Sequence, residues 1–276
     1  MKTRHLIFLS ALGLGTAALA IDFGSLGSTL DKIKQGVDTG KQVNHALQPI
    51  SLEEEVAIGE SVSLEVIGHF GGLVRDEAIT HRVNLIGRAL ARYSDRPELN
   101  WHFGVLNSDT VNAFSAPGGY VFITLALYQQ AGTDDELAGV LSHEITHITA
   151  KHALHIIKRA DMFGAIDTVG NQYSQNYRNA KSTVDDVDSH LQQFDTGINK
   201  IFSGLILNGF DQKTEFAADD GGHKLAAVTG YAPGGLRAVL QQLKANGGDS
   251  KKVFSTHPPL ADRIRRLPDE PATLSP

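Results

Sequence analysis

The sequence contains no cysteine among its 276 residues. This absence excludes thiol nucleophiles, disulfide bridges, cysteine-ligated zinc fingers and lipid anchors attached through cysteine. Basic residues are fewer than acidic ones, 25 Lys and Arg against 31 Asp and Glu, and the formal charge of −6 argues against a nucleic-acid partner. No apolar run of about 18 residues occurs beyond the N-terminus, so we expect no transmembrane helix in the mature protein. Histidine, by contrast, is abundant, with 12 against only 2 methionines.

The first 20 residues have the pattern of a secretory signal peptide. Lys2 and Arg4 form a short positive region, and an apolar run follows over Leu6–Leu19. The run ends at Ala18-Leu19-Ala20, which places small residues where a signal peptidase cleaves. A membrane anchor is the alternative, but an apolar run of about 15 residues is short for spanning a bilayer. We therefore expect residues 1–20 to be removed and the protein to be exported.

Two regions of different character follow. Residues 21–48 form an N-terminal leader that is rich in Gly, Ser, Lys and Asp. Its apolar residues recur at helical spacing, at Leu26, Leu30, Ile33 and Val37. The leader is either loosely packed or an amphipathic helix that contacts a membrane surface or a partner protein. Residues 49–276 are expected to form one domain, interrupted by a polar excursion at 164–200 that is rich in Asn, Gln, Asp and Ser.

The apolar pattern of this domain predicts many helices and a small sheet. Helical spacing begins after Ser51, where Ser51-x-x-Glu54 resembles a capping box, and continues to about Tyr93. Residues 100–106 alternate in the manner of a strand, and residues 120–124 form a second candidate strand. The intervening residues 112–119 have the composition of a turn.

A helix that begins at Thr133-Asp134-Asp135-Glu136, another capping box, carries the sequence His143-Glu144-Ile145-Thr146-His147. Side chains four residues apart on a helix point in nearly the same direction, so both imidazoles can bind one metal ion. Glu144 flanks the space between them and suits a base that acts on metal-bound water better than it suits a ligand. The alternative is that two unrelated histidines fall on one helix by chance.

A catalytic zinc ion needs a third protein ligand and an open fourth position. A downstream histidine after a glycine turn is excluded, because the positions required for the glycine and the histidine hold Ala150 and Ala153. His152 lies about 140° around the helix from His147, so it cannot join the site while the helix continues. We therefore expect His152 and His155 to be packed or hydrogen-bonded histidines.

A carboxylate from a second helix is the better candidate for the third ligand. Glu215 and Asp219 lie four residues apart, on one face of a predicted helix. Glu215 would bind the metal, and Asp219 would accept the free N–H of a ligand histidine. The glycines at 221 and 222 leave little bulk, so this helix could approach another backbone closely. The alternative interpretation is an acidic face exposed to solvent.

These motifs resemble those of the gluzincin metallopeptidases of the HtpX and CAAX prenyl protease family. Three further segments share the resemblance: Ser51–Gly59, Asn112–Gly119 with its Asn-Ala-Phe and Pro-Gly-Gly sequences, and His257-Pro258-Pro259 followed by Arg263-Ile264. The resemblance extends over about residues 50–268. Because the transmembrane helices of HtpX and the prenyl proteases are absent, the chain is similar to the soluble, exported branch of BepA-like and LoiP-like periplasmic proteases.

The resemblance implies an α+β zincin domain, mainly helical, with one Zn²⁺ per chain held by His143, His147 and Glu215. It implies hydrolysis of peptide bonds with Glu144 as the base. It also implies that an edge strand near residues 119–124 flanks the active-site cleft and pairs with an extended polypeptide. The candidate substrate-binding residues are therefore Gly118, Gly119, Tyr120 and Val121. For the cell, this branch implies a periplasmic location, quality control of misfolded or envelope proteins, and contact with a membrane surface or with outer-membrane assembly.

His257 is open to three interpretations. It could donate a hydrogen bond to the oxyanion of the tetrahedral intermediate, bind zinc as a fourth ligand at rest, or simply precede a helix at Pro258. Two other classes of function also stay open. One is a chaperone-like protein that binds polypeptides and retains the zinc site, and the other is a metal-dependent hydrolase of non-peptide amides or esters. The intact Glu144 favours an active enzyme.

Overall fold

The computed structural model describes residues 49–159, 197–247, 257 and 259–271 of the chain. The expectations for the signal peptide at 1–20 and the leader at 21–48 therefore lie outside the described residues, as does nearly all of the polar excursion at 164–200. The fold described below is that of the unit that begins at Pro49.

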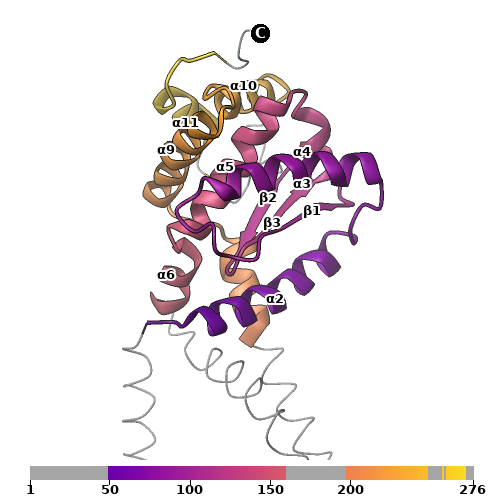
Figure 1. Cartoon of the computed structure of the whole chain (residues 1–276), viewed down its shortest axis with the longest axis vertical. Helices are drawn as coiled ribbons and strands as arrows, with labels where there is room; N and C mark the ends of the chain where they lie inside the picture. Colours follow the sequence, from indigo (N-terminus) through magenta and orange to yellow (C-terminus); the bar gives the residue numbers. More distant parts are fainter. Residues whose placement is uncertain (1–48, 160–196, 248–256, 258, 272–276) are drawn as a thin grey trace, which may run out of the picture. The chain divides into compact units, whose positions relative to one another are not determined.

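Most of the described chain is helical (Figure 1). In chain order the helices are α2 (Leu52–His69), α3 (Glu77–Arg92), α4 (Leu125–Gln130), α5 (Asp134–Thr149), α6 (His152–Arg159), the π-helix η1 (Ser203–Leu207), α9 (Gln212–Thr229), α10 (Gly235–Ala245) and α11 (Leu260–Arg266). Both predicted capping boxes are confirmed, because Ser51 and Thr133 each exchange hydrogen bonds with the glutamate three residues later. Within the ranges described, no helix combines the length and the apolar composition needed to cross a membrane.

The described strands form one mixed sheet of three members: β1 (His102–Leu106), β2 (Ala113–Ala116) and β3 (Tyr120–Thr124). The strand order is β1-β3-β2, and β3 runs parallel to β1 and antiparallel to β2. The strands predicted at 100–106 and 120–124 are confirmed. With this sheet and its helices, the predicted α+β, mainly helical class is confirmed as well.

Two expectations about the sheet are wrong. Residues 112–119 do not form only a turn, because β2 occupies the first half of this segment. Nor is β3 an edge strand: it lies between β1 and β2 and pairs with both, so neither side of it can accept a substrate strand. Among the described strands, β2 is the one that pairs on a single side and also packs against α5. The sequence does not indicate β2 as a strand, because its four residues are all buried and so do not alternate between polar and apolar as a half-exposed strand does.

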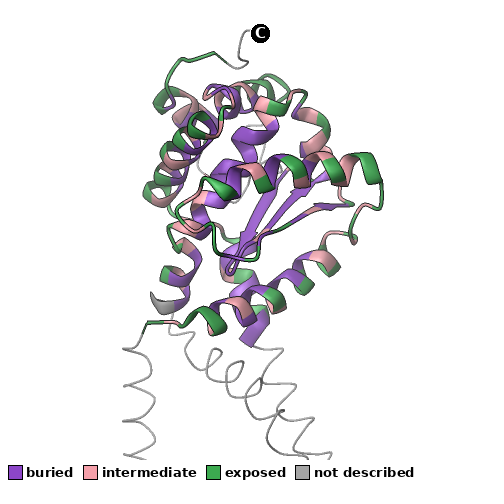
Figure 2. Cartoon of the chain, viewed as in Figure 1, coloured by how far each residue is buried: buried purple, intermediate pink, exposed green. Residues whose placement is uncertain are grey.

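Both faces of the sheet are covered, and α5 lies inside the larger core (Figures 1 and 2). Phe103 and Val121 lie on the face that packs against α3, α5 and α10. Leu106 and Phe122 belong to a second core, formed with α2, α6 and η1. Nearly every side chain of α5 from Leu137 onward is buried, so the helix that carries the two histidines is fixed on all sides.

Helices α9 and α10 approach α5 through glycines. A Cβ on Gly222 would lie 2.8 Å from the backbone nitrogen of His143, and a Cβ on Gly139 would lie 2.3 Å from the backbone nitrogen of Leu236. The close approach predicted for the helix that contains Gly222 is therefore confirmed. It places the acidic face of α9 directly beside His143.

Candidate metal centre

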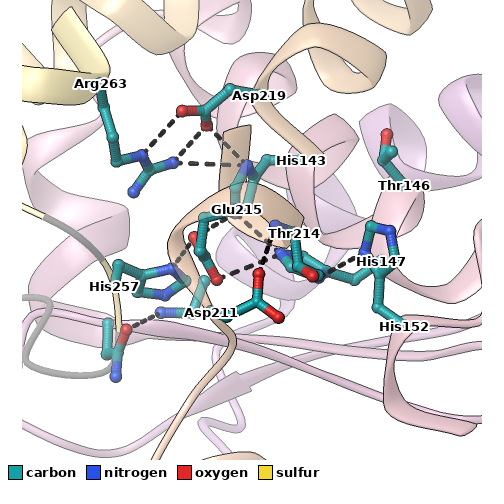
Figure 3. A network of polar contacts seen from close by, with 12 residues as sticks. His143, Thr146, His147, His152, Asp211, Thr214, Glu215, Asp219, His257 and Arg263 are labelled. Carbon is teal, nitrogen blue, oxygen red and sulfur yellow. Dashed lines mark hydrogen bonds and ion pairs between the residues drawn. The ribbon is translucent and has the colours of Figure 1, made fainter. Parts of the chain in front are cut away.

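Three buried side chains from α5 and α9 converge on one point (Figure 3). His143 and His147 extend from α5 one turn apart, and Glu215 extends from the first turn of α9. Their ligand atoms all lie within 4.8 Å of one another. The fold thus brings together the three ligands that the sequence predicts.

The spacing of these atoms fits a tetrahedral metal ion. The two Nε2 atoms are 3.2 Å apart, and each is 3.5 Å from a carboxylate oxygen of Glu215. Ligands at about 2.0–2.1 Å from a tetrahedral zinc ion are separated by about 3.3 Å. In addition, Oε1 of Glu215 is buried and accepts no hydrogen bond from the described residues. Such a carboxylate oxygen is costly unless a cation completes its surroundings, so the residues present fit a bound metal ion.

Asp219 and Arg263 support His143 from behind. Oδ1 of Asp219 lies 2.9 Å from Nδ1 of His143, which is the position of an acceptor for the ligand's N–H. Arg263 is fully buried and donates hydrogen bonds from Nε and one Nη to the two oxygens of Asp219, at 3.0 and 2.6 Å. Burial acts to raise the pKa of Asp219, but the charge of Arg263 and the contact with His143 outweigh it and hold this pKa well below its usual range. Burial and Arg263 act to lower the pKa of His143, whereas its hydrogen bonds to Asp219 and Glu215 outweigh both and raise it to about 9.

His257 contacts the third ligand. Its Nδ1 lies 2.5 Å from Oε2 of Glu215, and its ring centroid is 5.6 Å from that of His143. Burial acts to raise the pKa of Glu215, but the neighbouring histidines, His257 foremost, hold this pKa well below its usual range. His257 thus comes within hydrogen-bond range of the ligand set, and both functional interpretations of this residue remain available.

His147 has two close neighbours on its outer side. Its Nδ1 lies 3.0 Å from Nδ1 of His152, so His152 is hydrogen-bonded, one of the two states expected for it. The ring of Phe210 stacks on that of His147 with centroids 4.2 Å apart and planes 18° from parallel. Burial lowers the pKa of His147 well below its usual value and also lowers the pKa of His152, which favours the neutral form of both rings. His155, by contrast, is exposed.

Glu144 is buried beside the ligands, with 2% of its surface exposed. Burial raises its pKa, although the imidazoles of His143 and His257 act in the opposite direction. A carboxylate whose pKa is raised is a stronger base and so a better proton acceptor. The arrangement therefore suits Glu144 to take a proton from a water molecule between it and a metal ion.

The four candidate substrate-binding residues are engaged within the protein. The N–H of Gly118 donates to Oε1 of Glu55 at 3.1 Å, and the carbonyl of Gly119 accepts a hydrogen bond from β1 at 2.8 Å. Tyr120 is part of β3 and pairs with both neighbouring strands, and Val121 is fully buried. The expectation that this segment offers an open backbone edge is corrected by these contacts. The reason is that β2, which closes the sheet on that side, was not foreseen.

The sequence alone did not predict that Arg263, His152 and Phe210 lie behind the ligand residues. Arg263 had one signal, its place in the motif that follows His257. His152 and Phe210 had none, because their contacts depend on the break between α5 and α6 and on the approach of the segment before α9. Such contacts arise only when the chain is folded.

The domain is α+β and mainly helical, and the His-Glu-x-x-His motif of one helix meets a glutamate from a second helix. This arrangement is the site of a zincin-type metallopeptidase. The chain belongs to peptidase family M48, whose model matches residues 77–270. This match confirms the family resemblance inferred from the motifs.

Relatives of this chain carry protease names. The beta-barrel assembly-enhancing protease of Yersinia pestis is 26% identical over 212 residues, which cover 76% of this chain and 42% of the relative. Metalloprotease YcaL of Escherichia coli is 27% identical over 70% of each chain. A protease HtpX homolog of Bacillus velezensis is 29% identical over 70% of this chain and 69% of the relative. The chain therefore spans only about two fifths of the beta-barrel assembly-enhancing protease that it matches.

Proposed function

We propose that this domain is a zinc-dependent endopeptidase that hydrolyses peptide bonds in other proteins. The observation that carries the proposal is the trio of ligand atoms within 4.8 Å of one another, with Glu144 buried beside it. Two imidazoles and one carboxylate form a ligand set of catalytic zinc sites and leave a position for water or substrate. Membership of peptidase family M48 supports the same reaction.

The mechanism follows from the positions of the side chains. Held by His143, His147 and Glu215, a zinc ion would lower the pKa of a water molecule to about 7 and polarise the scissile carbonyl. Glu144 accepts the proton of the attacking water and later delivers it to the nitrogen of the leaving amine. His257 donates a hydrogen bond to the negative charge that develops on the carbonyl oxygen. Because the carboxylate of Glu215 accepts a hydrogen bond from Nδ1 of His257, donation to the oxyanion would come from Nε2 and requires both ring nitrogens to carry a proton.

An extended polypeptide would pair with β2 rather than with β3. Support comes from the position of β2 at the margin of the sheet beside α5, with β3 as its one partner among the described strands. Strand addition engages the backbone of the substrate and therefore accepts many sequences. Misfolded or envelope proteins are substrates of this kind.

The proposal extends to the setting of the enzyme. A signal-like segment at residues 1–20 and the similarity to a protein named for beta-barrel assembly support a periplasmic location and a role in quality control at the outer membrane. The excess of acidic residues supports polypeptide rather than nucleic-acid partners.

Casein degradation by the purified protein tests the proposed activity. The zinc-loaded protein should cleave casein, a chelator should stop cleavage, and added zinc should restore it. Glu144→Gln should keep its zinc, and its rate of cleavage should fall about 10²–10⁴-fold, because glutamine has nearly the same shape as glutamate but cannot accept the proton. Glu65→Gln, at an exposed position on α2, is the matched control and should behave as wild type. Cleavage that persists in Glu144→Gln would contradict the mechanism, and turnover of small amides without cleavage of casein would favour a non-peptide hydrolase.

A further inference from the structure

His152 occupies a position that a continuous helix would not give it. α5 ends at Thr149, Lys151 adopts a left-handed backbone with φ of 56°, and α6 begins at His152. In an unbroken helix the side chain five residues after His147 would point about 140° away from it. The break instead brings the two Nδ1 atoms to 3.0 Å (Figure 3). A left-handed conformation is unfavourable for a residue with a side chain, so the surrounding packing must hold this turn in place.

A metal ion held by Nε2 of His147 would fix the direction of this hydrogen bond. Nε2 of His147 faces the other ligands, at 3.2 Å from Nε2 of His143 and 3.5 Å from Oε1 of Glu215. A nitrogen that binds a metal carries its lone pair there, so with a metal ion on Nε2 the ring proton of His147 would reside on Nδ1. His147 would then be the donor and Nδ1 of His152 the acceptor.

Phe210 restricts the same ring in another way. Its ring lies flat against that of His147, at 4.2 Å and 18°, and its centroid is 6.0 Å from that of His152. Stacking opposes small turns about the Cβ–Cγ bond, which would tilt the imidazole out of its plane, but a 180° flip about that bond would leave the stacking intact. The hydrogen bond to His152 opposes the flip, because the flip would move Nδ1 away from its acceptor.

We propose that His152 is a positioning residue of the metal centre, which sets the tautomer and the ring orientation of His147 by accepting the hydrogen bond from its Nδ1. It does for His147 what Asp219 does for His143, with a neutral imidazole in place of a carboxylate. The inference rests on the metal site proposed above. Outer partners of ligand histidines are typically worth about 10–100-fold in metal affinity, and we expect an effect of this size.

A pair of variants with similar shape isolates the acceptor. Asn at position 152 can present Oδ1 near the place of the imidazole Nδ1, whereas Leu has nearly the same shape and no acceptor. Metal-free wild type, His152→Asn and His152→Leu would each be titrated with Zn²⁺ against a chromophoric chelator. The Leu variant should bind zinc about 10–100-fold more weakly than wild type, and the Asn variant should remain close to wild type. His155→Leu, on the exposed side of the same helix, is the matched control and should leave the affinity unchanged.

Two further measurements complete the test. Co²⁺ in place of Zn²⁺ should give the absorption of a tetrahedral site in wild type and in both variants, since His152 is an outer partner rather than a ligand. Thermal unfolding of the metal-free proteins shows whether the Leu and Asn variants are equally folded. Zinc affinity that is unchanged in His152→Leu, or equally weak in both variants, would overturn the role of His152. Failure of the wild type itself to bind zinc would instead contradict the metal site, so the two failures can be told apart.

Discussion

Arg263 and Asp219 form a two-pronged ion pair inside the protein although they lie 44 residues apart in the chain. The exposed fractions of their side chains are 0% and 2%. The pair joins α11 to α9, and through the carboxylate it reaches Nδ1 of His143. The last described helix is therefore part of the support of the metal centre.

Removal of the arginine should destabilise the protein strongly. Arg263→Met leaves the carboxylate of Asp219 buried without its cation, and we expect a loss of about 3–5 kcal/mol in the free energy of unfolding, measured with urea. Arg266 and Asp220 provide the matched control, because they join the same two helices at 3.7 Å but are about half exposed. Arg266→Met should therefore cost no more than about 1 kcal/mol. Equal losses in the two variants would show that burial of the ion pair is not what matters.

The same carboxylate should make the protein sensitive to acid. Because the folded protein holds the pKa of Asp219 below its unfolded value of about 3.9, the stability that this group contributes is fully present above that value. It is lost as the pH falls through about 4 toward the lower pKa of the folded state. Metal-free wild type should therefore lose more stability between about pH 5 and 3 than Asp219→Asn does, as measured by denaturant unfolding at each pH. Parallel curves for the two proteins would contradict this assignment.

Gly222 should be intolerant of any side chain. A Cβ there would lie 2.8 Å and 2.9 Å from the backbone nitrogen and Cα of His143, so Gly222→Ala must push α9 away from α5. We expect a loss of about 1–3 kcal/mol in stability, together with weaker zinc binding because Glu215 moves with α9. Gly68→Ala in α2 is the control, since a Cβ there meets nothing within 4 Å, and it should be neutral or stabilise by up to about 1 kcal/mol. Both the free energy of unfolding and the zinc affinity should be measured. A Gly222→Ala protein in which both are unchanged would contradict the close packing of α9 against α5.

Replacement of His257 distinguishes its two functional interpretations, because one predicts a loss of activity and the other predicts a gain. If the imidazole donates to the oxyanion, His257→Ala should lower kcat on a peptide substrate by about 10²–10³ while KM changes little and zinc stays bound. If the imidazole instead binds zinc as a resting-state ligand, the same variant should be more active and could cleave itself. The expected result is the loss of turnover, and a gain would reverse the role assigned to His257.

Much of the metal centre could be predicted because its key relations are local. The two histidines are four residues apart on one helix, and the caps at Ser51 and Thr133 depend only on residues three positions away. Glu215 could be assigned because a second helix with Asp219 on the same face suits a third ligand and its outer neighbour. Each of these inferences needs no knowledge of tertiary contacts.

The relations that could not be predicted are long-range or depend on an unusual backbone. β2 became a strand by pairing with β3, against a local composition that is typical of a turn, and this displaced β3 from the edge of the sheet. Arg263 reaches Asp219 only after the chain has folded back. His152 reaches His147 because Lys151 leaves the helical region of backbone space, which no feature of the sequence around it indicates.

The zinc content of purified Glu215→Ala, compared with wild type, tests the central claim most directly. Glu215 supplies the carboxylate from α9, and without it two histidines cannot complete a catalytic zinc site. Asp220→Ala, a neighbouring acidic position that is exposed, is the matched control. Elemental analysis after dialysis should find one zinc ion per chain in wild type and in Asp220→Ala, and almost none in Glu215→Ala. One zinc ion retained per chain in Glu215→Ala would contradict the metal centre described for this protein.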